Sequence, residues 1–513
     1  MLAGVRRILL GAAVLAVAAL LTSCTGSDPT ASPSQPSTSS SSLSAGPTSG
    51  PSLSATSGSG TASTSRPNFV FILTDDLAWN LVSHMPHVQA LQRAGNTMSN
   101  YYVVDSLCCP SRSAIFTGEY PHDDGVFTNS GSDGGYDAYN KNGNQSRTFA
   151  LALQKAGYTT AFMGKYLNGY EPKDPVPPGW NEWDVAGKSG YREFNYSLNE
   201  NGRQVRYGKD PSNYMVDVLS NKAGSFIDSS ASSGKPFLLE VATFAPHAPY
   251  TPAPRYATAA KTVTYPKTPA YNAAPSAPPS WLKGHPALTP ANQTAITTAY
   301  QKRVEADMAV DDMVGHVEQQ LQAKGIAQNT YIVFSSDNGY HMGEYRLLPG
   351  KQTAFDTDVH VPLILTGPGV PAGHTSTQLT SNIDLAPTFE SLGGAATGSN
   401  VDGVSLSGVW HGQQPGNWQQ AVLIEHHGPN DNKGDPDAQN AAHADPPSYE
   451  AIRTADALYV RYSSGEQEYY NTTTDPNELT NSAAKGVPPQ LPKTLSALAN
   501  CHSARVCLTA AKL

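Results

Sequence analysis

The stretch NFVFILTDD, residues 68–76, contains an unbroken apolar run, Phe69–Leu73, and ends in two aspartates. An apolar run of this length, rich in aromatic and β-branched residues, predicts a strand that is buried on both faces. The stretch TYIVFSSDNG, residues 330–339, has the same design and ends in Asp-Asn-Gly. Such strands occur in parallel sheets that helices cover on both sides, so the two stretches predict an α/β domain.

Further strands and helices alternate between and after these two stretches. Apolar runs at residues 158–163, 237–242 and 362–365 predict strands, and helical periodicity predicts helices at 149–156 and 292–324. The alternation predicts a large, mostly parallel central sheet flanked by helices.

Polar residues follow the predicted strands: Asp75, Asp76, Lys165, His247, Asp337 and Asn338. Each of them alone is typical of a turn, a helix cap or a solvated surface. Parallel sheets place their active sites beyond the carboxyl ends of the strands, so the coincidence of several such residues favours one shared site. Three carboxylates and an amide offer hard oxygen ligands, which suit Ca²⁺ or Mg²⁺ rather than zinc.

Two adjacent cysteines lie in SLCCPSRSAIFTGEY, residues 106–120. Neighbouring Cα atoms are about 3.8 Å apart, below the usual disulfide range of about 4.4–6.8 Å, so Cys108 and Cys109 are poor partners for each other. Pro110 favours a helix start, which places Cys108 just before a helix N-terminus that attracts anions, with Arg112 close by. A nucleophile that faces a bound oxyanion fits this pattern, and a buried structural cysteine is the alternative. Cys501 and Cys507 are close in sequence, and we expect them to form a disulfide.

The N-terminal residues 1–24 have the layout of an export signal, with two arginines before a short apolar run. The ending Leu21-Thr22-Ser23-Cys24 resembles the bacterial lipoprotein box, which implies lipidation of Cys24 and a membrane anchor. Ordinary cleavage with loss of Cys24, giving a secreted protein, is the alternative. Residues 25–66 are almost entirely Ser, Thr, Pro, Gly and Ala and predict a disordered tether.

The composition narrows the class of protein further. The 513 residues carry a net charge of −9, and their number suits one large domain plus a smaller one. No basic run stands out, so we expect no nucleic-acid partner.

The CCPSR motif at residues 108–112, extended by Ile115-x-Thr117-Gly118, matches the Cys-x-Pro-Ser-Arg signature of the formylglycine-dependent sulfatases, which this chain resembles. The other matching positions follow in the family's order: Asp75-Asp76, Lys165, His247, Asp337-Asn338 and Lys351. The resemblance implies an alkaline-phosphatase/sulfatase-like catalytic domain over residues 67–400. A smaller C-terminal α+β subdomain over 401–513 would follow, since residues 468–478 look like that part of the family.

The resemblance also implies a role for each matching residue. A formylglycine-generating enzyme would oxidise Cys108 to formylglycine, whose hydrated form attacks the sulfur of a sulfate ester. Cys109 would only fill the variable position of the motif. The implied ligands of Ca²⁺, or of Mg²⁺, are Asp75, Asp76, Asp337, Asn338 and the modified Cys108. Arg112 would orient the nucleophile, Lys165 and Lys351 would grip sulfate oxygens, and His247 would contact the sulfate or protonate the leaving oxygen.

One departure from the family pattern concerns the base for sulfate release. Many members have a histidine two places after the lysine, where this chain has Leu167. The stretch GKYLN, residues 164–168, resembles the N-acetylglucosamine-6-sulfatase branch, which implies a sulfated sugar substrate. His341 follows Asp-Asn-Gly-Tyr and could face the leaving group. The pair His426-His427 is more typical of an ordinary loop than of a ligand site.

These observations favour an exported, surface-anchored sulfatase that acts on sulfated sugars or glycans. The enzyme alternatives are an arylsulfatase and a phosphonate or phosphodiester hydrolase with the same nucleophile. A tethered glycan-binding protein is the non-enzyme alternative, and the retained Asp75, Asp76, Arg112 and Asp337 speak against it.

Overall fold

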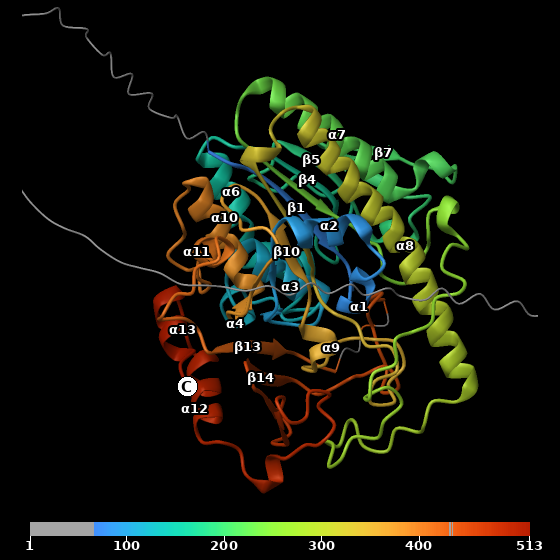
Figure 1. Cartoon of the computed structure of the whole chain (residues 1–513), viewed down its shortest axis with the longest axis vertical. Helices are drawn as coiled ribbons and strands as arrows, with labels where there is room; N and C mark the ends of the chain where they lie inside the picture. Colours follow the sequence, from blue (N-terminus) through green and yellow to red (C-terminus); the bar gives the residue numbers. More distant parts are fainter. Residues whose placement is uncertain (1–65, 430–431, 433) are drawn as a thin grey trace, which may run out of the picture. The chain divides into compact units, whose positions relative to one another are not determined.

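A ten-stranded mixed sheet forms the centre of the described part of the chain, with helices on both of its faces (Figure 1). In spatial order the strands are β11 (His374–Ser376), β2 (Asn96–Met98), β10 (Leu363–Thr366), β9 (Thr330–Ser336), β1 (Asn68–Thr74), β8 (Phe237–Ala242), β4 (Thr159–Lys165), β5 (Glu182–Ala186), β6 (Ser197–Glu200) and β7 (Arg203–Arg206). The strands from β9 to β5 run parallel, whereas β10, β6 and β7 pair antiparallel to their neighbours. The prediction of a mostly parallel central sheet is confirmed, with antiparallel strands added on both sides of its centre.

The computed structural model describes residues 66–429, 432 and 434–513. The predicted export signal, Cys24 and all of the predicted tether except Arg66 lie outside the described residues. Among those described, we find no helix with the length and apolar character that a membrane crossing requires.

Both faces of the sheet are buried, because successive side chains of a strand point to opposite sides. Phe69, Phe71 and Leu73 of β1 pack into one hydrophobic core, and Val70 and Ile72 pack into the other. Helices α6 (Phe149–Lys155) and α10 (Leu385–Gly393) cover the first face, and α7 (Met215–Ser233) and α8 (Pro290–Ala323) cover the second (Figure 1). The uninterrupted apolar pattern of β1 therefore has a direct cause in this three-layer arrangement.

The remaining elements of this region are short. They are α1 (Trp79–Val82), α2 (Pro86–Ala94), β3 (Tyr101–Tyr102), α3 (Cys108–Thr117), α4 (Pro121–Asp124), α5 (Gly135–Lys141), α9 (Asp356–Val359), β12 (Thr380–Ser381) and α11 (Ser407–Trp410). The long helix α8 begins with a capping box between Thr289 and Asn292.

The predicted element ends agree closely with the structure, with one informative difference. Helix α3 begins at Cys108 itself, so this cysteine lies in the first turn rather than before it. Leu107 is the extended N-cap residue, and Pro110 is tolerated because N–H groups of the first turn have no partner within the helix. Gly118 ends the helix with a φ of 72°, a conformation that glycine adopts without strain.

A separate four-stranded antiparallel sheet follows the large one. Its strands are β13 (Ala421–His426), β14 (Tyr449–Thr454), β15 (Ala457–Tyr462) and β16 (Gln467–Asn471), and the helices α12 (Gln490–Leu498) and α13 (Ala504–Ala510) follow it. A disulfide joins Cys501 to Cys507, and both sulfurs lie in a small core with Leu495 and Leu498. This α+β arrangement confirms the predicted character of the C-terminal part, whereas the boundary at residue 400 stays a prediction.

Candidate active site

The two acidic motifs meet because adjacent parallel strands end at the same level. Thr74 of β1 pairs with Ser336 of β9, so Asp75-Asp76 and Asp337-Asn338 leave the sheet side by side. The Asp76 backbone N–H donates to Asp337 Oδ1 at 3.1 Å. Asp76 has a φ of 66°, an uncommon conformation that aspartate tolerates better than most residues do.

Cys108 lies at the centre of the cluster, at the start of α3, with a fully buried side chain. Its Sγ is 3.2 Å from Asp75 Oδ1 and 2.8 Å from Lys351 Nζ. Burial, followed by the charges of nearby carboxylates, raises the pKa of the Cys108 thiol well above its ordinary value. Because the thiolate is the nucleophilic form, the unmodified thiol is poorly activated at this place.

Arg112 joins α3 to the carboxyl ends of β9 and β4. Its Nε donates to Asp337 Oδ2 at 2.8 Å, and its NH1 donates to the Lys165 carbonyl at 2.7 Å. Burial raises the pKa of Asp337, but Arg112 and the nearby lysines outweigh this effect and hold the pKa below its ordinary value. The Arg112–Asp337 pair is therefore ionised although it is buried.

Two lysines approach the cluster from different segments. Lys165, at the end of β4, places Nζ 2.6 Å from Asp75 Oδ2, and Lys351 places Nζ 2.6 Å from Asp76 Oδ1. Burial alone lowers the pKa of each lysine. Asp75 beside Lys165 and the carboxylates beside Lys351 raise the pKa by more than burial lowers it, so both pKa values lie well above the ordinary value. Both lysines are therefore cations that are held ready for an anion.

His247 follows β8 and donates from both ring nitrogens. Its Nδ1 lies 2.7 Å from the Ala248 carbonyl oxygen, and its Nε2 lies 2.6 Å from Asp437 Oδ1. Both partners can only accept, so the ring carries two protons. Burial lowers the pKa of His247, but the carboxylates of Asp75, Asp437 and Asp76 overcome this and raise it to about 9.

Asp437 is a member of the cluster that sequence reasoning missed. It lies in the connection between β13 and β14, and its Oδ1 contacts Lys351 Nζ at 2.8 Å as well as His247. Its Oδ2 accepts from Asn129 Nδ2 at 2.7 Å. The stretch Gly434-Asp435-Pro436-Asp437 is typical of a turn, and nothing in its pattern distinguishes one aspartate as part of a site.

Two of the predicted histidine assignments change in the structure. His341 is buried, but its Nδ1 lies 3.0 Å from Asp358 and its Nε2 lies 2.6 Å from the His443 carbonyl. Both nitrogens are thus engaged outside the cluster, so a role at the leaving group finds no support in this geometry. His426 is not a loop residue, because it ends β13 and is buried beside Asp105, whereas His427 is exposed and pairs with Asp133.

The cluster fits a hard divalent cation. Carboxylate oxygens of Asp75 and Asp76 lie within 4.8 Å of each other and of side-chain atoms of Cys108 and His247, although the doubly protonated His247 ring is not itself a ligand. Asn338 Oδ1 is buried and has no hydrogen-bond partner in the described part of the chain. An amide oxygen without a partner, next to carboxylates, is a donor type that Ca²⁺ and Mg²⁺ accept. Among the other predicted ligands, Asp75 and Asp76 are paired with Lys165 and Lys351, whereas the Asp337 oxygens accept from Arg112 and from backbone N–H groups.

Residues of the cluster line two cavities. One, of about 190 Å³, is lined by Lys165, Leu167 and Tyr191, and the other, of about 460 Å³, is lined by Asp76, His247 and Asp437. Cys108 lines neither of them. Leu167, which replaces the histidine of many family members, thus contributes an apolar wall beside Lys165.

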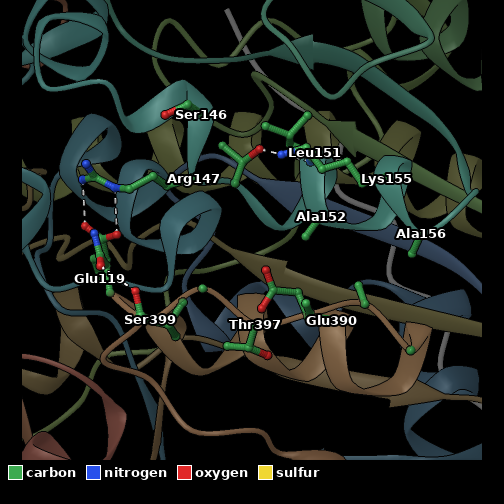
Figure 2. Close-up of a pocket in the computed structure, with 17 residues that line it drawn as sticks. Glu119, Ser146, Arg147, Leu151, Ala152, Lys155, Ala156, Glu390, Thr397 and Ser399 are labelled. Atoms are coloured by element: carbon green, nitrogen blue, oxygen red, sulfur yellow. Dashed lines mark hydrogen bonds and ion pairs between the residues drawn. The ribbon is translucent and has the colours of Figure 1, made fainter.

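A third cavity, of about 600 Å³, lies between α6 and the segment that follows α10 (Figure 2). Glu119 and Arg147 form an ion pair at one end of it, and Glu390 and Thr397 lie along its floor. None of the predicted site residues lines it, so the size of this cavity does not make it the catalytic centre.

Two models of known protein families match the chain. A family model described as Sulfatase matches residues 67–395. A second model, described as N-sulphoglucosamine sulphohydrolase, C-terminal, matches residues 343–500.

Curated relatives include the human N-acetylglucosamine-6-sulfatase, which is 35% identical over 463 residues. The match covers 84% of this chain and 83% of the human protein. An extracellular sulfatase SULF-1 homolog of Drosophila melanogaster is 36% identical over 381 residues, which are 72% of this chain and 34% of that longer protein.

Solved structures agree on the fold. A protein in complex with its substrate D-glucosamine-2-N,6-O-disulfate superposes with a TM-score of 0.72 at 22% identity, covering 84% of this chain and 97% of the other. The phosphonate monoester hydrolase of Agrobacterium radiobacter superposes with a TM-score of 0.63 at 21% identity, over 82% of this chain and 92% of that one. Sulfatases and a phosphonate hydrolase therefore share this architecture, and the fold alone does not choose the chemistry.

Proposed function

Because the chain belongs to the sulfatase family and is a sulfuric ester hydrolase, we propose that it removes the 6-sulfate of N-acetylglucosamine, free or at the end of a sulfated glycan. The observation that carries the proposal is the meeting of Cys108 with Asp75 and Lys351 at the start of α3. The choice of sugar is supported by the 35% identity to the human N-acetylglucosamine-6-sulfatase over most of both chains.

Formylglycine at position 108 would supply a hydroxyl nucleophile for the sulfur, in place of the poorly activated thiol. Asp75 Oδ1 and Lys351 Nζ lie within hydrogen-bond distance of the side-chain atom at this position, so both can hold and orient such a hydroxyl. Arg112 fixes the same helix turn through Asp337, and its NH2 is buried without a partner in the described residues.

A bound Ca²⁺ would supply positive charge against a sulfate oxygen. Asp75, Asp76 and Asn338 would hold it, and Mg²⁺ fits the same donors. Lys165 and Lys351 would bind the other sulfate oxygens. Both lysines remain protonated, and they contact the adjacent residues Asp75 and Asp76. Preorganised charges of this kind are each worth about 3–4 kcal/mol in a transition state.

His247 would supply the proton for the leaving sugar oxygen. Its Nε2–H points into the cluster, toward the Asp437 and Asp76 carboxylates, and its pKa of about 9 keeps it protonated near neutral pH. A protonated imidazole within reach of the ester oxygen is the general acid that the displacement needs.

Two measurements test the proposal. The protein is produced together with a formylglycine-generating enzyme, and mass spectrometry of the Cys108 peptide is expected to find the aldehyde. The purified protein is then assayed against N-acetylglucosamine 6-sulfate, other sulfated sugars, an aryl sulfate and an aryl phosphodiester. We expect the highest kcat/KM for the first substrate. A preference for the phosphodiester would replace the proposal with the phosphodiester hydrolase alternative, and glycan binding without turnover would replace it with a glycan-binding protein.

We further propose that the protein works outside the cell, held to a membrane by a lipid on Cys24. The apolar run before Cys24 and the curated relatives named extracellular sulfatases support this location. Globomycin-sensitive processing, or radiolabelled fatty acid on wild type but not on Cys24→Ala, tests it. Release of unlabelled protein into the medium would instead indicate ordinary secretion.

A further inference from the structure

Lys351, which is assigned to the substrate's sulfate, and His247, which is assigned to its leaving oxygen, are already bound to a carboxylate of the chain itself. Asp437 Oδ1 accepts from His247 Nε2 at 2.6 Å and from Lys351 Nζ at 2.8 Å. Asp437 Oδ2 accepts from Asn129 Nδ2 at 2.7 Å. We name the three donors Lys351 Nζ, His247 Nε2 and Asn129 Nδ2 the anion cradle.

We propose that the Asp437 carboxylate occupies the sulfate position between turnovers, that the substrate's sulfate displaces it, and that its return expels the inorganic sulfate product. The proposal deepens the proposed function and rests on it. A carboxylate and a sulfate both present oxygens to the same charge-assisted donors, so one can replace the other without any change in the cradle.

The cradle is built close to the nucleophile. Lys351 Nζ, which binds Asp437, also lies 2.8 Å from Cys108 Sγ. Asn129 accepts the Cys109 N–H through its Oδ1 at 2.9 Å, so it connects the cradle to the first turn of α3. An anion that reaches the side chain at position 108 therefore meets Lys351, a donor that Asp437 now holds.

The burial of Cys108 favours a movement of this kind. The Cys108 side chain is fully buried, and the two cavities beside the cluster share Pro436 in their walls. Asp437 follows Pro436 directly, in a segment without helix or strand over the described residues 434–448. Asp75, Lys165 and Asp337 come from strand ends and Arg112 comes from α3, whereas Lys351, like Asp437, lies in a segment without helix or strand. A shift of the segment around Asp437 vacates the cradle and opens the route between the cavities in one step.

Sulfate binding by the mature, calcium-loaded full-length protein tests the proposal by isothermal titration calorimetry, a measurement that needs no turnover. We expect Asp437→Ala and Asp437→Asn to bind sulfate about tenfold or more tightly than wild type, because the competing anion is lost. Inhibition by sulfate in the turnover assay is expected to strengthen by the same factor. Unchanged or weaker sulfate binding in both variants, with correct thermal unfolding, would overturn the proposal.

A matched control separates competition from damage to the segment. The Asn440 side chain accepts the Ala442 N–H at 2.9 Å and thereby shapes the same segment without touching the cradle donors. Asn440→Ala is expected to leave sulfate affinity within about twofold of wild type. An equal gain in the sulfate affinity of Asn440→Ala would mean that loosening of the segment causes the effect, and it would contradict the proposal.

A crystal structure with sulfate gives the direct answer. We expect sulfate on Lys351, His247 and Asn129, with the Asp437 carboxylate moved away from all three. Sulfate bound while Asp437 stays on the cradle would overturn the proposal. Turnover of N-acetylglucosamine 6-sulfate by wild type reports separately on the proposed function, because the displacement of Asp437 is read from binding and from the crystal.

Discussion

Two charged sites of the molecule, each with buried carboxylates, are built differently. Glu119 and Arg147, at the end of the cavity in Figure 2, form a closed pair with bonds of 2.9 and 2.8 Å. In the cluster around Cys108, Lys351 touches Asp76, Asp437 and the sulfur at once. Atoms of Arg112 and Asn338 are left without partners in the described residues. A closed pair serves the fold, whereas shared and unsatisfied groups are arranged for a ligand.

The largest expected effect comes from removing the nucleophile. Cys108→Ala is expected to lower kcat on sulfate esters by about 10⁴-fold or more, because the covalent route is lost. Cys109→Ala is the matched control, since Cys109 is equally buried but belongs to the hydrophobic core. We expect it to keep most of the activity with a lower free energy of unfolding. Activity that depends on Cys109 instead would reverse the assignment of the two cysteines.

Removal of the metal ion gives the next effect. Calcium is expected to raise the midpoint of thermal unfolding, because it binds the native carboxylates and the unpartnered Asn338 oxygen. Asn338→Ala is expected to weaken calcium binding by at least about tenfold. Calorimetry on the two proteins measures both quantities. Equal calcium affinity in the variant and the wild type would remove Asn338 from the site.

The closed pair offers the contrasting prediction. Arg147→Ala leaves Glu119 buried without its cation, so the free energy of unfolding is expected to fall by about 1–3 kcal/mol. The kcat of the enzyme should change by less than about twofold, because neither residue lines the two cavities at the cluster. Urea unfolding and the turnover assay measure the two effects. A large loss of kcat with unchanged stability would erase the distinction between the two regions.

The smallest effect is a dependence of stability on pH at a third charged contact. Burial lowers the pKa of His122, but Glu425 Oε2 at 2.8 Å and the Cys501 carbonyl at 2.8 Å outweigh it and raise the pKa to about 9. The folded pKa is raised above the ordinary 6.5, so this stabilisation is complete below pH 6.5 and is lost as the pH rises through 9.

His122→Gln tests this dependence. The variant is expected to be less stable than wild type by about 1–2 kcal/mol at pH 6, and the difference should shrink by pH 9.5. Urea unfolding at the two pH values gives both free energies. A difference that stays constant over this range would mean that packing, not the charge of His122, carries the stabilisation.

The sequence predicted the part of the site that local patterns encode. Apolar strands end at Asp75 and Asp337, and the register of adjacent parallel strands then leaves no choice about which carboxylates meet. The CCPSR motif predicted a helix start, and the structure moves that start by only two residues, from Pro110 to Cys108.

The rest of the site depends on contacts that no local pattern records. Asp437 and Asn129 reach the cluster from segments whose sequence is typical of turns, and only the docking of the C-terminal part brings Asp437 to Lys351. His341 follows β9, the strand that leads into the cluster, but hydrogen bonds to Asp358 and to the His443 carbonyl hold its ring outside the cluster. Sequence spacing located its backbone and could not predict its orientation.

The pairing of Thr74 with Ser336 fixes the relative positions of the two acidic motifs that follow β1 and β9. An inserted or deleted residue in either strand would slide one acidic motif by about 3.3 Å and turn its side chains to the opposite layer. Substitutions can therefore retune this enzyme's pocket, but a change in the length of β1 or β9 would take the site apart.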